Sequence, residues 1–160
     1  MIVAKKGGAI RSLADLRGRR FAFGDRDSTL THVVPVYMLV EAGVHIVELG
    51  KIAFIGTHDN LALNVVAGTF DAAGLMPDIA AKYPDLQVIA TSPALPEHVF
   101  VATPSMDAAT FAGLQQALLA LDPALRKGIK GSLTGMQKAN DKDFDVLRKI
   151  LEVAEREPEK

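Results

Sequence analysis

The chain has 160 residues, of which 49% are hydrophobic and 23% are charged, and its formal net charge is −1 at pH 7. This composition predicts a folded globular protein rather than a disordered chain. Charges of both signs are scattered along the sequence, which argues against the basic face of a nucleic-acid-binding protein. There is no cysteine, so disulfides and thiolate metal sites are excluded.

No apolar run approaches the roughly 20 residues that a membrane-spanning helix needs. Residues 1–8 lack the long apolar stretch of a signal peptide. We therefore expect a secreted protein with this sequence to have lost its leader.

Short apolar runs alternate with helical patterns over the first part of the chain. The predicted strands lie at residues 2–4, 19–24, 45–55 (as two short pieces around Gly50), 70–75 and 86–90. The predicted helices lie at residues 12–16, 29–42, 61–67 and 77–83. Strands and helices that alternate at this spacing indicate βαβ units and a largely parallel sheet.

The pattern changes after Pro93 and Pro96. A strand is predicted at 99–102, helices at 107–121, 123–130 and 144–154, a loop at 131–135 and a frayed tail at 155–160. The expected division is an α/β lobe over residues 12–96, flanked by residues 1–11 and 97–160.

Two strand-to-helix junctions are candidate binding sites. In the first, the apolar residues 21–23 end at Gly24, and Ser28 and Thr29 precede a helix. In the second, Thr57 and His58 precede the next helix. Free N–H groups and the helix dipole favour an anion at such a junction. Plain N-capping by Ser28 and Thr57 explains the same residues without any ligand.

A series of segments resembles ABC-transporter substrate-binding proteins of the phosphonate/phosphite/phosphate-binding branch. The first is SLADLRGRRFAFG at residues 12–24. In the same order follow Ser28-Thr29 with Pro35 and Glu41-Ala42-Gly43, then GTHD at 56–59, VAGTFDA at 66–72, SPALP at 92–96 and DKDFDVLR at 141–148.

The resemblance implies a type II periplasmic-binding-protein fold with a mostly parallel, helix-flanked sheet. It also implies a solute-binding component that closes on a small oxyanion about a hinge and is then read by an ABC permease, in the periplasm or cell envelope. The expected hinge strands are residues 2–4 and 99–102. No enzymatic activity and no cofactor are implied.

Two departures from the family stand out. Leu30 occupies the place where the family has a ligand hydroxyl. Family members also carry a long portion ahead of the segment that begins at Ser12, which forms most of their first lobe. The chain is therefore expected to represent the second lobe, the crossing strands and the C-terminal helices, beside an incomplete first lobe.

By resemblance, Ser28 and Thr29 supply hydroxyl and N–H donors, and Thr31 partly replaces the hydroxyl lost at Leu30. His58 donates from its ring, and Asp71 accepts the proton of a monoprotonated oxyanion or holds His58. The plain alternatives are capping residues, a surface histidine and a turn aspartate. The other histidines have no metal-site spacing.

An interaction role is the alternative function. A shortened α/β sensor or interaction module would leave apolar surface exposed around 99–102 and the helix 107–121, and a second copy would cover it as a homodimer. An enzyme is disfavoured, because no nucleophile elbow and no Walker loop is present.

Overall fold

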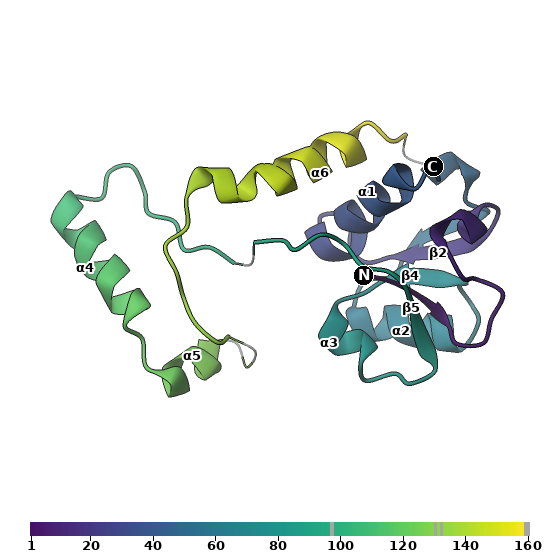
Figure 1. Ribbon diagram of the computed structural model, residues 1–160, viewed down its shortest axis with the longest axis horizontal. Coiled ribbons are helices and arrows are strands. Elements are labelled where there is room, and N and C mark those ends of the chain that lie inside the picture. The colour runs from purple at the N-terminus through teal and green to yellow at the C-terminus, as the bar shows by residue number, and fades with distance from the viewer. Residues whose placement is uncertain (97, 130, 132, 159–160) are drawn as a thin grey trace. The chain divides into compact units, whose positions relative to one another are not determined.

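The computed structural model describes residues 1–96, 98–129, 131 and 133–158. It divides into two compact units, Met1–Leu95 with Val146–Lys160, and Pro96–Asp145. Figure 1 shows the elements of both units.

The first unit is built on a five-stranded sheet in the order β3-β2-β4-β1-β5. Strand β2 is parallel to β3 and β4, whereas β1 is antiparallel to β4 and β5. Four strands therefore run in one direction and only β1 opposes them, which confirms the mostly parallel sheet. The strands are β1 (Ile2–Lys5), β2 (Arg20–Phe23), β3 (Lys51–Phe54), β4 (Ala72–Gly74) and β5 (Leu86–Ala90).

Helices cover both faces of this sheet (Figure 1). They are α1 (Val34–Glu41), which continues a π-helical turn at Thr29–Val33, and α2 (His58–Val66), α3 (Pro77–Ala80) and α6 (Asp145–Glu155). Short 3-10 turns lie at Leu13–Leu16, Ile46–Glu48 and Asp141–Phe144.

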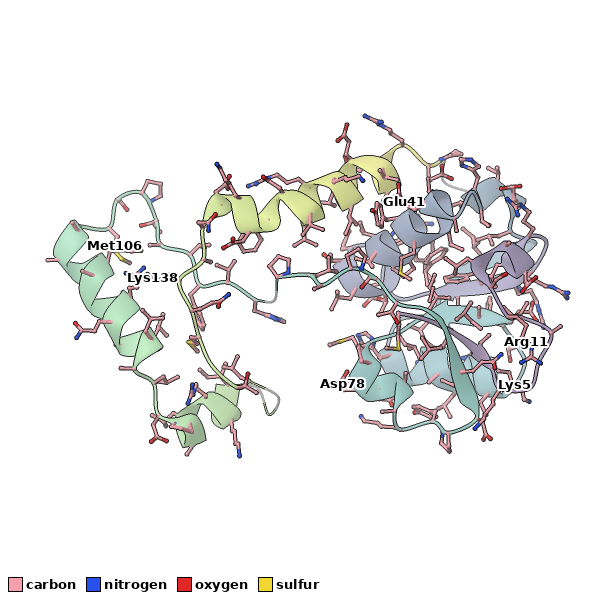
Figure 2. The ribbon with its side chains drawn as sticks, viewed as in Figure 1. Lys5, Arg11, Glu41, Asp78, Met106 and Lys138 are labelled. Carbon is pink, nitrogen blue, oxygen red and sulfur yellow. The ribbon has the colours of Figure 1, made fainter. Side chains whose placement is uncertain are left out.

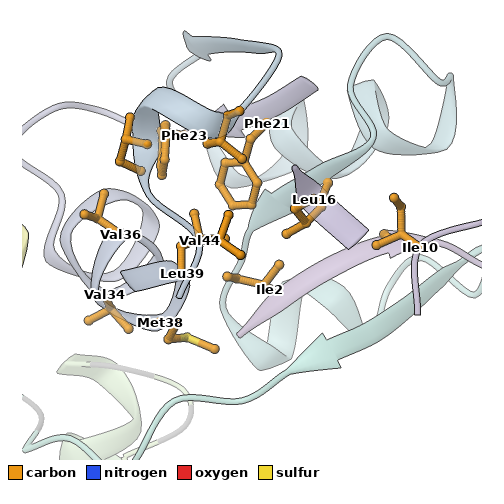
Figure 3. Packing of buried hydrophobic residues seen from close by; sticks show 14 of the residues in the cluster. Ile2, Ile10, Leu16, Phe21, Phe23, Val34, Val36, Met38, Leu39 and Val44 are labelled. Atoms are coloured by element: carbon orange, nitrogen blue, oxygen red, sulfur yellow. The ribbon is translucent and has the colours of Figure 1, made fainter. Parts of the chain in front are cut away.

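Alternate strand residues point to opposite faces and build two cores. Phe21 and Phe23 of β2 pack with Leu39 of α1 and Ile150 of α6 (Figure 3 shows part of this cluster). Ala22 between them packs on the other face with residues of α2. The helices after β2 and β3 therefore lie on opposite faces.

The second unit contains α4 (Ala108–Leu119) and α5 (Pro123–Ile129). None of its described residues is buried. The strand predicted at 99–102 is wrong, because these residues have no regular secondary structure. An apolar run forms a strand only where a neighbouring strand completes its ladder, and none lies beside it among the described residues.

Strand β1 changes the predicted division of the chain. The sequence analysis placed residues 1–11 outside the lobe, whereas β1 lies inside the sheet between β4 and β5. The compact unit thus begins at Met1 and also takes in α6.

Smaller differences concern local elements. Of the two strand pieces predicted within 45–55, the first is a 3-10 turn, and α3 stops at Ala80 instead of reaching residue 83. The predicted fraying of the tail is wrong for Glu157, whose carboxylate binds His45 Nδ1 (2.9 Å) and the Ile46 N–H (3.0 Å). Lys130 and Ser132 of the predicted helix and loop, and residues 159–160 of the tail, lie outside the described residues. Over the described ranges, every helix is too short or too polar to cross a membrane.

Candidate functional site

The carboxyl ends of β2, β3 and β4 lie at one edge of the sheet, because these strands are parallel neighbours. Each strand leads directly into a helix: β2 into the π-helical turn and α1, β3 into α2, and β4 into α3. The helices that follow β2 and β3 lie on opposite faces. Ligands of open α/β sheets bind at such a switch point, outside the strand ends.

Glycines let the first turn rest directly on these strand ends. A Cβ atom at Gly24 would clash with the Thr31 side chain and lie 3.3 Å from the carbonyl oxygen of Gly56. A Cβ atom at Gly74 would clash with the Pro35 ring. The Gly24 N–H donates to the Thr31 carbonyl (3.1 Å). The turn that carries Ser28 is therefore fixed against the sheet by backbone contact.

Ser28 caps this turn and keeps a free proton. Its Oγ accepts hydrogen bonds from the Thr31 N–H (3.2 Å) and the Thr31 hydroxyl (2.7 Å). Both lone pairs are engaged, so the Ser28 O–H remains available only as a donor. Thr29 is exposed, and its N–H belongs to the first turn, which has no intrahelical acceptor.

Thr31 does not face outward as the predicted ligand donor. It is 2% exposed, and its hydroxyl proton goes to Ser28. It therefore orients Ser28 from inside the fold. Leu30 is 37% exposed, so the position of the missing hydroxyl presents an apolar side chain.

His58 is the first residue of α2, on the other side of the same edge. Thr57 caps this helix, because its Oγ1 accepts from the Asn60 N–H (3.4 Å). His58 is half-buried, and its Nδ1 is buried without a hydrogen-bond partner in the described structure. The junction thus has an N-terminal helix turn and an unsatisfied ring nitrogen.

Asp71 lies at the opposite edge, beside the start of β2. Its carboxylate accepts from the Arg20 backbone N–H (2.8 Å), Nε (3.1 Å) and Nη2 (2.9 Å). Hydrogen bonds from this guanidinium hold the pKa of Asp71 below its usual value. Asp71 therefore lies at the start of β4, whereas Ser28 and His58 follow the ends of β2 and β3.

Asp78, in the first turn of α3, is a carboxylate that follows the end of β4, and the sequence analysis did not name it (Figure 2). It is exposed, and its Oδ1 accepts from the Ile79 N–H (3.1 Å). Asp78 follows a strand end, as Ser28 and His58 do, whereas Asp71 precedes a strand start. Among the described side chains, no group of three His, Asp or Glu is placed to hold a metal ion.

The family model described as "ABC transporter, phosphonate, periplasmic substrate-binding protein" matches residues 1–149. The chain belongs to this family. This confirms the resemblance drawn from the ordered segments. The family consists of transporter solute-binding proteins rather than enzymes.

Known relatives agree with this assignment. The "Probable ABC transporter phosphite binding protein PhnD1" of Prochlorococcus marinus (strain MIT 9301) is 40% identical over 68 residues, covering 41% of this chain and 23% of that protein. The structure of PhnD1 from the same organism in complex with methylphosphonate has a TM-score of 0.74 at 24% identity, covering 93% of this chain and 64% of that one.

A binding protein component of an ABC phosphonate transporter from Pseudomonas aeruginosa (PA3383) also has a TM-score of 0.74, at 20% identity over 98% of this chain and 57% of that chain. XAC2383 from Xanthomonas citri, bound to ATP, has a TM-score of 0.75 at 20% identity, over 98% and 65%. These likenesses show the fold. The chain spans less than two thirds of each of these relatives.

Proposed function

We propose that this chain binds a small oxyanion of the phosphonate, phosphite or phosphate class as the solute-binding component of an ABC transporter. The observation that carries the proposal is the pair of capped helix N-termini, at Ser28 and at Thr57, which follow the carboxyl ends of neighbouring parallel strands. Family membership and the phosphite and methylphosphonate named for PhnD1 support the ligand class.

The donors come from both junctions. On one side, the Ser28 hydroxyl and the N–H groups of Thr29 and Leu30 point their protons at the anion. On the other side, the first N–H groups of α2 and the ring of His58 do the same. Each helix dipole adds partial positive charge at its N-terminus.

Asp78 takes the acceptor role that the sequence assigned to Asp71. A monoprotonated oxyanion carries one O–H, and a carboxylate at the same edge accepts it. The support is topological, because α3 begins directly after β4, whose end lies beside that of β2.

Binding is proposed to close a hinge. The chain passes from one compact unit to the other at Leu95–Pro96 and at Asp145–Val146. These two connections are the proposed hinge, in place of residues 2–4 and 99–102. Hinge closure needs backbone rotation at only a few such residues. The closed form would then be read by an ABC permease, with the protein acting in the periplasm or cell envelope.

Calorimetry with methylphosphonate, phosphite, phosphate and an alkanesulfonate tests the ligand class. We expect binding of at least one of the first three. Ser28→Ala should weaken it roughly tenfold or more, because a hydrogen bond to a charged group is lost. Asp78→Asn should also weaken it, and Asp71→Asn is the matched control that leaves affinity unchanged.

Leu30→Ser restores the hydroxyl of the family pattern and should favour phosphate relative to methylphosphonate. The absence of heat with every oxyanion would contradict the proposed ligand class, and an equal loss in Asp71→Asn and Asp78→Asn would contradict the assignment of the acceptor.

A second function is favoured by one observation, the exposed apolar residues of the second unit. Val99, Phe100 and Val101 are 46%, 62% and 84% exposed, and Phe111 of α4 is 45% exposed. Contiguous exposed apolar groups mark interaction surfaces. A homodimer that covers them is the alternative, and light scattering that gives a monomer mass at all concentrations would exclude it.

A further inference from the structure

His32, which the sequence interpretation treated as a solvated or packed residue, joins the two halves of the proposed site. Its ring meets Phe23 edge-on (centroids 5.2 Å apart, 74°) and Phe54 edge-on (4.9 Å, 84°). Phe23 and Phe54 are themselves stacked at 5.6 Å. These are the last residues of β2 and β3, the strands that lead to Ser28 and to His58.

The same ring also fixes the loop in front of Ser28. His32 Nδ1 lies 2.6 Å from the Arg26 carbonyl oxygen. A carbonyl oxygen can only accept, so Nδ1 carries the proton and donates it. The Arg26 guanidinium carbon lies 4.2 Å from the centre of the Phe54 ring. The loop is thereby attached to the end of β3 from both its backbone and its side chain.

The attachment bears directly on Ser28. Residues 25–27 are exposed. The Ser28 N–H donates to the Asp25 carbonyl (3.0 Å), and His32 Nδ1 donates to the Arg26 carbonyl. The Ser28 carbonyl in turn accepts from the His32 N–H (3.0 Å). His32 therefore binds the chain both before and at the residue whose hydroxyl faces the anion.

We propose that His32 is a positioning residue of the oxyanion site, which holds the loop of residues 25–28 through its Nδ1–H and registers it against the end of β3. It touches no ligand itself. The inference rests on the proposed function for its effect on binding, but its structural part concerns the unliganded protein.

Two substitutions separate this role from simple packing. The side-chain amide of Asn places an N–H near the position of Nδ1, whereas that of Gln places it near Nε2. His32→Asn should retain the bond to the Arg26 carbonyl, and His32→Gln should lose it. Both remove the aromatic ring, so each is the control for the loss of ring contacts in the other.

We expect methylphosphonate affinity to fall about fivefold to tenfold more in His32→Gln than in His32→Asn, as for one lost hydrogen bond. Nitrogen NMR of His32 should report the proton on Nδ1 in the unliganded wild type. Amide hydrogen exchange at residues 28–31 should be faster in His32→Gln than in His32→Asn, with exchange in β1 unchanged in both as the check on folding.

Equal affinities and equal exchange in the two variants, or a proton found only on Nε2, would overturn the proposal. If the wild type binds no oxyanion, the proposed function fails, and the NMR and exchange results still decide whether His32 holds the loop. If the wild type binds and the two variants do not differ, the proposed function stands and the role of His32 is rejected.

Discussion

Helices in both units have N-caps, but their surroundings differ between the unit of residues 1–95 with 146–160 and the unit of residues 96–145. Thr57 caps α2, and Asp107 caps α4 by accepting from the N–H groups of Ala109 (3.1 Å) and Thr110 (2.9 Å). Helix α2 buries Leu61 and further apolar residues, whereas α4 buries none. Local signals therefore define where a helix starts, and only a sheet face gives it a core to stabilise it.

Truncating one aromatic residue in each unit should give the largest contrast. Phe21 is fully buried and Phe111 is 45% exposed. We expect Phe21→Ala to lower the free energy of unfolding by about 3–5 kcal/mol and Phe111→Ala to change it by about 0.5 kcal/mol or less. Urea unfolding measures both. A large loss in Phe111→Ala would mean that α4 is covered in solution, as by a second copy.

Replacing one glycine by alanine in each unit should change stability by less, with opposite signs in the two units. A Cβ atom at Gly24 clashes with Thr31, whereas one at Gly113 of α4 has nothing within 4 Å. Gly24→Ala should destabilise the protein by about 1–3 kcal/mol. Gly113→Ala should stabilise α4 by up to about 1 kcal/mol through helix propensity. Unfolding curves and amide exchange in α4 would show the reverse sign if α4 were tightly packed.

Removing one helix cap in each unit should separate global from local stability. Thr57→Ala should cost about 1 kcal/mol in the free energy of global unfolding, since α2 belongs to the core. Asp107→Ala should speed amide exchange in α4 while leaving global unfolding unchanged, because α4 buries no residue. A loss of global stability in Asp107→Ala would show that the two units unfold together.

The smallest effect concerns the residues after α6, where Glu157 contacts His45 and Ile46 of the same unit. A hydrogen bond to the Glu157 carboxylate, then its charge, raises the pKa of His45; Glu48 adds to the rise and Arg17 opposes it. Because the pKa of His45 is raised in the folded state, its protonation stabilises the protein. This stabilisation is fully present below the usual pKa of about 6.5 and is lost as pH rises through the folded pKa.

Glu157→Gln should therefore lower the melting temperature more at pH 6 than at pH 9. Some loss should remain at pH 9, because Glu157 also accepts the Ile46 N–H. Glu152→Gln is the control, since its ion pair with Arg156 is exposed and contains no histidine. A pH-independent difference for Glu157→Gln would remove His45 from this contact.

The accuracy of the sequence-based predictions depended on whether a feature is local. The caps at Ser28 and Thr57 and the helices that follow them were predicted from neighbouring residues, as was the helix that begins near Asp107. The position of β1 inside the sheet was missed, because strand order is set by distant pairing. The apolar run at 99–102 was predicted as a strand, although an apolar pattern does not show whether a partner strand lies beside it.

The candidate site shows the same limit. Ser28, Thr29 and His58 were placed at one edge because each follows a strand end. Asp71 was included although it precedes a strand, and a parallel sheet puts strand starts and strand ends at opposite edges. Thr31 was predicted to donate outward, but its side chain is buried. This burial depends on close packing against Gly24 and Gly74, which lie outside the turn that carries Thr31 and give no local signal. Topology, applied consistently, would have placed Asp71 at the opposite edge from Ser28 and Asp78 at the same edge.

The two hydrogen bonds that Ser28 Oγ accepts from Thr31 have a consequence for solute selection. A serine hydroxyl can usually both donate and accept hydrogen bonds, and it rotates its proton to suit an alcohol, an amine or an anion. Because both lone pairs of Ser28 Oγ are occupied, this hydroxyl can only donate a hydrogen bond, to a group that has an acceptor lone pair. An ammonium group has no lone pair to accept this proton, whereas an oxygen atom with a free lone pair does. Thr31 therefore fixes Ser28 as a hydrogen-bond donor from inside the fold.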